Sequence, residues 1–189
     1  MELITDSISL QKAGGLLLLL GGARSGKSSL AVDLASESAS TVVYVATAQA
    51  FDEDMKARIE RHKRERPDWQ TIEQPTGILK EIKETSSSSL LIIDCLTMWV
   101  SNLYLRGDSE NEISRASSQL LMELSNRPGR TIAISNEVGL GVVPETHLGR
   151  EFREILGRVN QQWARAAQQS LFLVAGKALQ LKNPKEYLS

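Results

Sequence analysis

The sequence predicts an α/β protein in which a mostly parallel sheet is flanked by helices. Two observations indicate this class: short, mainly apolar runs rich in Leu, Ile, Val and Ala, and longer segments between them with helical spacing of apolar residues. Their alternation predicts parallel strands joined by right-handed crossovers. A length of 189 residues fits one domain, expected over 16–189 after a mobile leader, 1–15, that lacks strong periodicity.

Each expected element has its own local signal. The five strands are expected at short, mainly apolar runs, 16–20, 41–46, 90–94, 131–135 and 171–175. Five helices lie between them, at 29–36, 52–66, 77–84, 112–126 and 146–169. The last helix has the clearest pattern, an apolar stripe on one face made of Leu148, Phe152, Ile155, Leu156, Val159 and Trp163. Pro67 is expected to end the second helix.

Composition excludes several classes of protein. The 22 Lys and Arg residues nearly balance 23 Asp and Glu residues, so net charge provides no attraction to nucleic acid or to an anionic membrane. The longest apolar run, 16–20, is far shorter than the roughly 20 residues of a membrane span. Cys95 is the only cysteine and cannot form an intramolecular disulfide. We therefore expect a cytoplasmic protein with no membrane span and no nucleic-acid partner.

The strongest chemical signal follows the first strand and fits the pattern G-x-x-x-x-G-K-[ST]. Its residues are Gly21, Gly22, Ala23, Arg24, Ser25, Gly26, Lys27 and Ser28. Small residues let backbone N–H groups surround a phosphate, and the helix that follows directs its positive end at the same anion. Lys27 is expected to reach the β- and γ-phosphates, and Ser28 to ligate Mg²⁺. A glycine-rich turn could match the pattern by chance, but the strand before it and the amphipathic helix after it favour nucleoside triphosphate binding.

A second acidic element should hold the metal from an adjacent strand. Asp94 ends the buried run 90–94 and has the expected form. Taken alone, such a residue is more often a strand end or a helix cap. Together with the phosphate-binding loop, it is predicted to bind Mg²⁺ directly or through water.

The expected helix at 52–66 carries a histidine, His62, three residues beyond the apolar Ile59. Cations crowd around it: Arg61, Lys63, Arg64 and Arg66. One interpretation is a solvated helix face with ion pairs and a surface histidine. The other is chemical, because neighbouring cations favour a neutral, nucleophilic imidazole and can hold a triphosphate. That combination would suit nucleotidyl transfer through a phosphoramidate, and spacing alone does not decide between the two.

Several segments together resemble a known family. They are the phosphate-binding loop, Tyr44-Val45-Ala46-Thr47-Ala48, the stretch 58–67, Trp69-Gln70-Thr71-Ile72-Glu73, the stretch 136–145, and Gly157-Arg158-Val159-Asn160-Gln161. In order and spacing they are similar to the bifunctional adenosylcobinamide kinase / adenosylcobinamide-phosphate guanylyltransferase family, CobU/CobP. The resemblance implies a RecA-like P-loop NTPase fold and a homo-oligomer. It also implies two reactions: phosphorylation of adenosylcobinamide with ATP or GTP, then GMP transfer from GTP to give adenosylcobinamide-GDP.

The resemblance also implies site residues. His62 matches the histidine that is guanylylated, and Lys27 belongs to the catalytic set. Nucleotide contacts are implied for the phosphate-binding loop and for Ala46, Thr47, Ala48, Lys63, Arg64, Glu65, Arg66, Glu73 and Asp94. The second histidine, His147, lies outside the matching segments and is expected at the surface or at a helix start. The segment 136–145 is expected to form an active-site rim that contacts corrinoid or a neighbouring subunit.

Two other functions use the same loop. A small-molecule P-loop kinase would need Lys27, Ser28 and Asp94 but not His62. A RecA-like switch or motor would hydrolyse nucleotide to act on a partner. The absence of an N-K-x-D guanine-recognition motif opposes a GTPase switch. Against a DNA-dependent motor, the net charge is near zero and only 5% of residues are aromatic, which leaves few stacking platforms.

Overall fold

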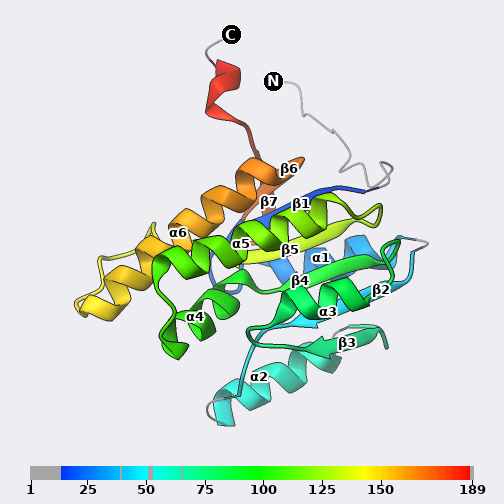
Figure 1. Cartoon of the computed structure of the whole chain (residues 1–189), viewed down its shortest axis with the longest axis horizontal. Coiled ribbons are helices and arrows are strands. Elements are labelled where there is room, and N and C mark those ends of the chain that lie inside the picture. Colours follow the sequence, from blue (N-terminus) through cyan, green and yellow to red (C-terminus); the bar gives the residue numbers. More distant parts are fainter. Residues whose placement is uncertain (1–13, 39, 51–52, 65, 188–189) are drawn as a thin grey trace.

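The computed structural model describes residues 14–38, 40–50, 53–64 and 66–187, which build one seven-stranded sheet. The strand order is β3-β2-β4-β5-β1-β6-β7, and every neighbouring pair is parallel except β6 with β7. Figure 1 shows the strands and their connections. The predicted mostly parallel sheet flanked by helices is confirmed. The expected leader falls almost entirely outside the described residues.

The strands are β1 Leu16–Gly21, β2 Val42–Ala46, β3 Gln70–Glu73, β4 Leu90–Asp94, β5 Thr131–Asn136, β6 Gln169–Val174 and β7 Lys177–Leu181. The helices are α1 Lys27–Ser36, α2 Glu53–Arg64, α3 Ile78–Glu84, α4 Leu96–Arg106, α5 Glu110–Ser125, α6 His147–Ala166 and the 3₁₀ turn η1 Pro184–Tyr187. All ten predicted elements are therefore present, with ends that differ by a few residues.

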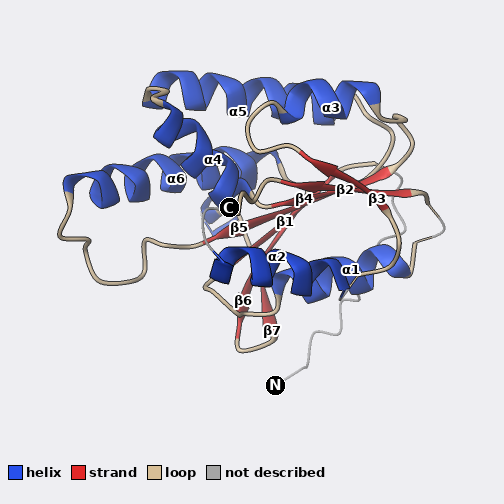
Figure 2. Ribbon diagram, turned by 90° about the horizontal axis from the view of Figure 1, so that it is seen from below, coloured by secondary structure: helices blue, strands red, loops and turns tan. Residues whose placement is uncertain are grey.

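Helices cover both faces of the sheet. In Figure 2, α3, α4, α5 and α6 lie on one side, and α1 and α2 lie on the other. The residues of β1 alternate between the two layers: Leu16, Leu18 and Leu20 join the core under α3 to α6, while Leu17 and Leu19 join the core over α1. Burial of the strands on both faces explains why these runs have apolar residues at consecutive positions and do not alternate with polar ones.

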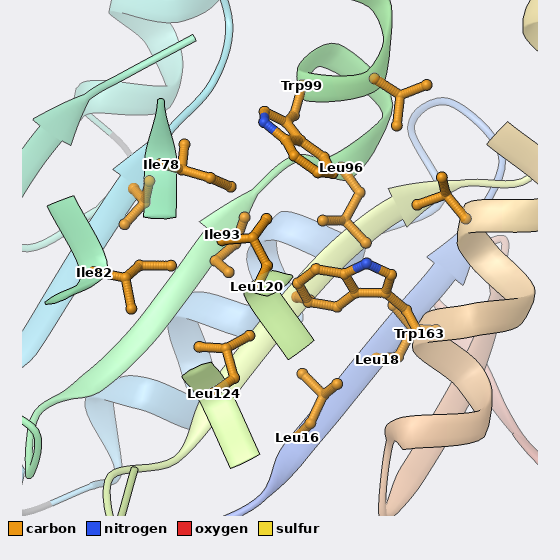
Figure 3. Close-up of a cluster of buried hydrophobic side chains, with 14 of the residues drawn as sticks. Leu16, Leu18, Ile78, Ile82, Ile93, Leu96, Trp99, Leu120, Leu124 and Trp163 are labelled. Carbon is orange, nitrogen blue, oxygen red and sulfur yellow. The ribbon is translucent and has the colours of Figure 1, made fainter. Parts of the chain in front are cut away.

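The larger core contains two tryptophans whose N–H groups both have partners (Figure 3). Trp163 of α6 donates to Ser117 Oγ at 3.0 Å, and Trp99 of α4 donates to the Thr76 carbonyl at 2.9 Å. Burying an indole in the core costs free energy unless its N–H donates a hydrogen bond. The second bond also fixes the loop after β3, which borders the site described below.

Besides the 3₁₀ turn η1, three elements were not predicted. The strand β3 is short and polar at both ends, and α4 follows β4 without a polar interruption, so neither has a clear period. Cys95 caps α4, its sulfur accepting from the Met98 N–H. The strand β7 follows a two-residue turn in which Ala175 and Gly176 both have positive φ, a geometry typical of tight hairpins. Ala175 therefore lies in this turn, and its predicted place in a strand is wrong.

Some predicted helix ends were also wrong. The helix expected at 146–169 ends at Ala166, because Gln169 already pairs with β1. At its start, Leu148 is exposed, since the first turns of α6 extend beyond the sheet (Figure 2). The helix α5 begins two residues earlier than expected because Ser109 and Glu112 form a capping box.

A buried arginine holds the loop between α3 and β4. The Arg127 guanidinium donates to the carbonyls of Ile82, Ser86 and Ser89 at 3.2, 2.7 and 3.4 Å. Burial lowers the pKa of Arg127 from its usual range. These bonds fix the approach to β4, the strand that carries Asp94.

Replacing Arg127 with alanine should lower the free energy of unfolding by about 2–3 kcal/mol, because buried carbonyls lose their donors. The measurement is urea unfolding followed by circular dichroism. Arg115, exposed on α5, provides the matched control, and Arg115→Ala should change stability by less than about 0.5 kcal/mol. Equal losses in the two variants would contradict this account.

Candidate nucleotide site

The phosphate-binding loop joins β1 to α1 through two glycines with positive φ. Gly26 caps α1 at a φ of 99°, and a Cβ on Gly21 would lie 2.4 Å from the Leu173 carbonyl oxygen of β6. Only glycine fits at Gly21, because that oxygen belongs to a strand hydrogen-bonded into the sheet. The loop therefore has the strand-turn-helix context that its pattern requires.

Lys27 lies against the loop that contains it. Its ammonium group donates to the carbonyl oxygens of Gly21 and Gly22 at 3.0 and 2.6 Å and to Ser25 Oγ at 3.2 Å. The side chain is buried, so these acceptors offset the cost of removing its charge from water. The cation thus lies within the turn that is expected to surround the phosphates.

Asp94 lies beside the phosphate-binding loop, although its strand is not a neighbour of β1, the strand that precedes the loop. Asp94 ends β4, and β5 lies between β4 and β1, so the expected adjacent strand is wrong. Contact is made through the first turn of α1, where Ser28 Oγ donates to Asp94 Oδ2 at 3.0 Å. The helix reaches across the end of β5, which sequence order alone does not reveal.

Sheet register brings three of the predicted residues into one row. Ala46 of β2 pairs with Glu73 of β3 on one side and with Asp94 of β4 on the other. The carboxyl ends of these parallel strands meet at one edge of the sheet, where ligands of open α/β sheets bind. Asn136, at the end of β5, lies at the same edge opposite Gly21.

Tyr44 connects Asp94 to the segment after α2. Its hydroxyl donates to Asp94 Oδ2, and the guanidinium carbon of Arg66 lies 4.0 Å from the centre of its ring. Burial, and then the charge of Asp94, raise the pKa of Tyr44 far above its usual value. The side chain is therefore a neutral phenol that donates to the carboxylate.

Thr47 connects the end of β2 to the residue that follows β4 through hydrogen bonds. Its hydroxyl donates to the Cys95 carbonyl at 2.7 Å and accepts from the Cys95 N–H at 2.8 Å, and its own carbonyl accepts from Asn102 at 2.8 Å. It is fully buried and does not line the cavity, so its side chain connects two strand ends. Burial raises the pKa of the Cys95 thiol to about 12, which leaves it unreactive at neutral pH.

A cavity of about 720 Å³ opens at this edge of the sheet. Its lining includes Ser28 and Asp94 from the phosphate side, Ala46, Ala48 and Glu73 from the strand ends, and Met55, Ile59, Lys63 and Arg66 from α2 and the segment after it. Apolar and charged groups thus line the same space. This mixture suits a nucleotide, which has a flat base and a charged tail.

The helix α2 is joined to the sheet edge by an ion pair. Lys63 Nζ lies 2.7 Å from Glu73 Oε1 and 3.4 Å from Glu60 Oε1. The hydrogen bond to Glu73 is the main reason that the pKa of Lys63 is raised. Residue 62 precedes Lys63 in α2, three positions after Ile59, which lines the cavity. The side chain of His62 lies outside the described part of the chain.

The other predicted residues have different positions. Arg64 is exposed at the end of α2 and does not line the cavity, and Glu65 lies outside the described residues. His147 is exposed and begins α6, as expected. Sequence reasoning did not name Tyr44, Met98 or Glu60 as site residues, although all three line the cavity. Tyr44 and Glu60 had a signal, because both lie in segments of the family resemblance, whereas Met98 had none.

The oxygen atoms of Ser28 and Asp94 suit Mg²⁺, a hard cation that takes oxygen ligands. Among the described residues there is no group of three or more His, Cys, Asp and Glu side chains that could hold a metal ion. Within the same residues, no helix is both long and apolar enough to cross a membrane.

Comparison with known proteins identifies the family. The family described as "Cobinamide kinase / cobinamide phosphate guanyltransferase" matches residues 17–181. This chain belongs to that family. The bifunctional adenosylcobalamin biosynthesis protein CobP of Pseudomonas aeruginosa is 43% identical over 168 residues, which cover 88% of this chain and 96% of CobP. The protein CobU of Escherichia coli (strain K12) is 37% identical over 181 residues, which cover 88% of this chain and 99% of CobU.

A solved structure supports the fold of this cobinamide kinase / guanyltransferase family member. The RadB recombinase is similar with a TM-score of 0.51 and 18% identity, over 85% of this chain and 74% of that chain. At this identity the likeness concerns the fold alone. It confirms the predicted RecA-like P-loop architecture.

The close approach at Gly21 makes a direct test of the loop possible. Gly21→Ala should lower the free energy of unfolding by about 1–3 kcal/mol, because neither the loop nor β6 can yield without strain. Gly22→Ala is the matched control, since no atom lies within 4 Å of a Cβ there, and should cost less than about 0.5 kcal/mol. Thermal and urea unfolding without nucleotide measure both. If Gly21→Ala left the free energy of unfolding unchanged, the close packing of Gly21 against β6 would be contradicted.

Proposed function

We propose that this chain is a bifunctional cobalamin-biosynthesis enzyme. It phosphorylates adenosylcobinamide with ATP or GTP and then transfers GMP from GTP to the product, giving adenosylcobinamide-GDP. The observation that carries the proposal is the single cavity lined both by the first turn after the phosphate-binding loop and by α2, the helix that contains His62. Family membership supports the same pair of activities.

In the kinase step, the hydroxyl of adenosylcobinamide attacks the γ-phosphorus. The bond to the β–γ bridging oxygen breaks, the nucleoside diphosphate leaves, and the hydroxyl proton passes to solvent. Backbone N–H groups of the loop and the Lys27 ammonium hold the phosphates and offset their charge. Ser28 and Asp94 are proposed to hold Mg²⁺, which when bound neutralises charge on the phosphates.

In the transferase step, the imidazole of His62 attacks the α-phosphorus of GTP and pyrophosphate leaves. A phosphate oxygen of adenosylcobinamide phosphate then attacks the same phosphorus, and the P–N bond breaks. Covalent capture divides one hard step into two easier ones. Lys63, Arg66 and Glu73 surround the part of the cavity beside α2, which supports their predicted nucleotide contacts. The contacts predicted for Arg64, Glu65 and Thr47 stay predictions.

We also propose that the enzyme is cytoplasmic, binds no nucleic acid and assembles with copies of itself. The loop from β5 to α6 supports assembly, because it exposes Leu140, Val142 and Val143. Large apolar side chains gathered on a surface loop are typical of contacts with another surface. The same loop is the predicted active-site rim.

Labelling with GTP that carries ³²P at the α-phosphate tests the transferase mechanism. The wild type should acquire an acid-labile, alkali-stable label, and His62→Ala should reduce it by at least about 1,000-fold while retaining kinase activity. His147→Ala is the matched control, because the chain has two histidines and His147 is exposed on α6. The control should keep the full label.

Two results would contradict the proposal. A kinase that acquires no label would be a small-molecule P-loop kinase, and a label that survives in His62→Ala would exclude that residue as the nucleophile. Nucleotide hydrolysis that rises with polynucleotide and not with corrinoid would indicate a RecA-like switch or motor. GMP transfer to adenosylcobinamide phosphate, measured directly, supports the full reaction.

A further inference from the structure

Tyr44 touches both halves of the nucleotide cavity. It lies on β2 with 3% of its surface exposed, yet it contributes to the cavity lining. Its hydroxyl reaches Asp94, which bonds to Ser28 at the phosphate side. Its ring supports Arg66, which follows α2 at the opposite side. One buried side chain therefore contacts the groups expected to hold the metal and those expected to hold the nucleotide beside α2.

The contact with Asp94 fixes the direction of the carboxylate. Oδ2 accepts from the hydroxyls of both Ser28 and Tyr44. Because two donors on different elements share one oxygen, rotation of the carboxylate would break at least one bond. In the sheet, Tyr44 pairs with Ile92, two residues before Asp94, so the ring runs along the sheet surface toward the strand end.

The contact with Arg66 is of a different kind. Its guanidinium lies over the ring face, where a cation is attracted by the π-electrons, and the attraction strengthens when water is excluded. The cation–π attraction needs the ring and not the hydroxyl, although the hydroxyl also interacts with Arg66. The two roles of Tyr44 can therefore be separated by substitution.

We propose that Tyr44 is a positioning residue whose hydroxyl orients Asp94 for Mg²⁺-dependent nucleotide binding and whose ring seats Arg66 for Mg²⁺-independent nucleotide binding. The inference rests on the proposed function in taking GTP with Mg²⁺ as the ligand. It does not depend on guanylyl transfer.

Titration calorimetry with GTP, in Mg²⁺ and in EDTA, tests the hydroxyl. Tyr44→Phe should reduce the gain in affinity that Mg²⁺ provides by about fivefold and have a much smaller effect on the affinity in EDTA, because the ring that supports Arg66 is retained. In the Asp94→Asn background the same change should have no further effect, because the hydroxyl acts through that carboxylate. A fivefold loss in both backgrounds, no loss in either, or a wild-type affinity independent of Mg²⁺ would overturn this part.

The ring is tested by Tyr44→Leu and, independently of that variant's folding, by Arg66→Gln. Each should weaken GTP binding in EDTA by about fivefold, whereas Tyr44→Phe should not. Equal affinities of Arg66→Gln and wild type in EDTA would overturn the seating of Arg66. Tyr104→Phe is the control, because this α4 tyrosine donates to Glu151 on α6 and does not line the cavity. Wild type that binds GTP normally but acquires no label would contradict only the proposed function.

Discussion

The hydrogen bond from Ser28 to Asp94 joins the first turn of α1 to the end of β4, a strand that is not a neighbour of β1 in the sheet. The bond spans the end of β5 and brings the end of the phosphate-binding loop to the Asp94 carboxylate of β4. Because sheet register places Ala46 and Glu73 in line with Asp94, this contact brings the phosphate-binding loop to the whole row of strand ends. The cavity is the space in front of that line, with α2 beside it.

Local signals account for what the sequence predicts well. The phosphate-binding loop is contiguous, and its required glycine at Gly21 and lysine at Lys27 are recognisable without tertiary structure. Strands buried on both faces and the apolar stripe of α6 have periods that are visible in the chain itself. The ten elements were predictable for this reason, and so was the gathering of strand-end residues at one edge.

Features that depend on distant partners were not predictable in the same way. The short strand β3 exists because β2 offers a parallel edge, and its own four residues have little strand character. The position of β5 between β4 and β1 is a property of topology. Tyr44 and Asn102 acquire their roles from hydrogen bonds over 50 and 55 positions of sequence. Nothing in the local pattern distinguishes them from other buried residues.

The two sides of the cavity are held by different forces. The phosphate-binding loop is fixed by strands of the core, since Gly21 lies against β6 and β1 is buried. No side chain described in α2 belongs to either core, and Met55 and Ile59 are only half-buried. Its end is held instead by the ion pair of Lys63 with Glu73, followed by the stacking of Arg66 on Tyr44. The position of residue 62 is therefore set by polar contacts at the site itself, and changes in these contacts should affect nucleotide chemistry more than folding.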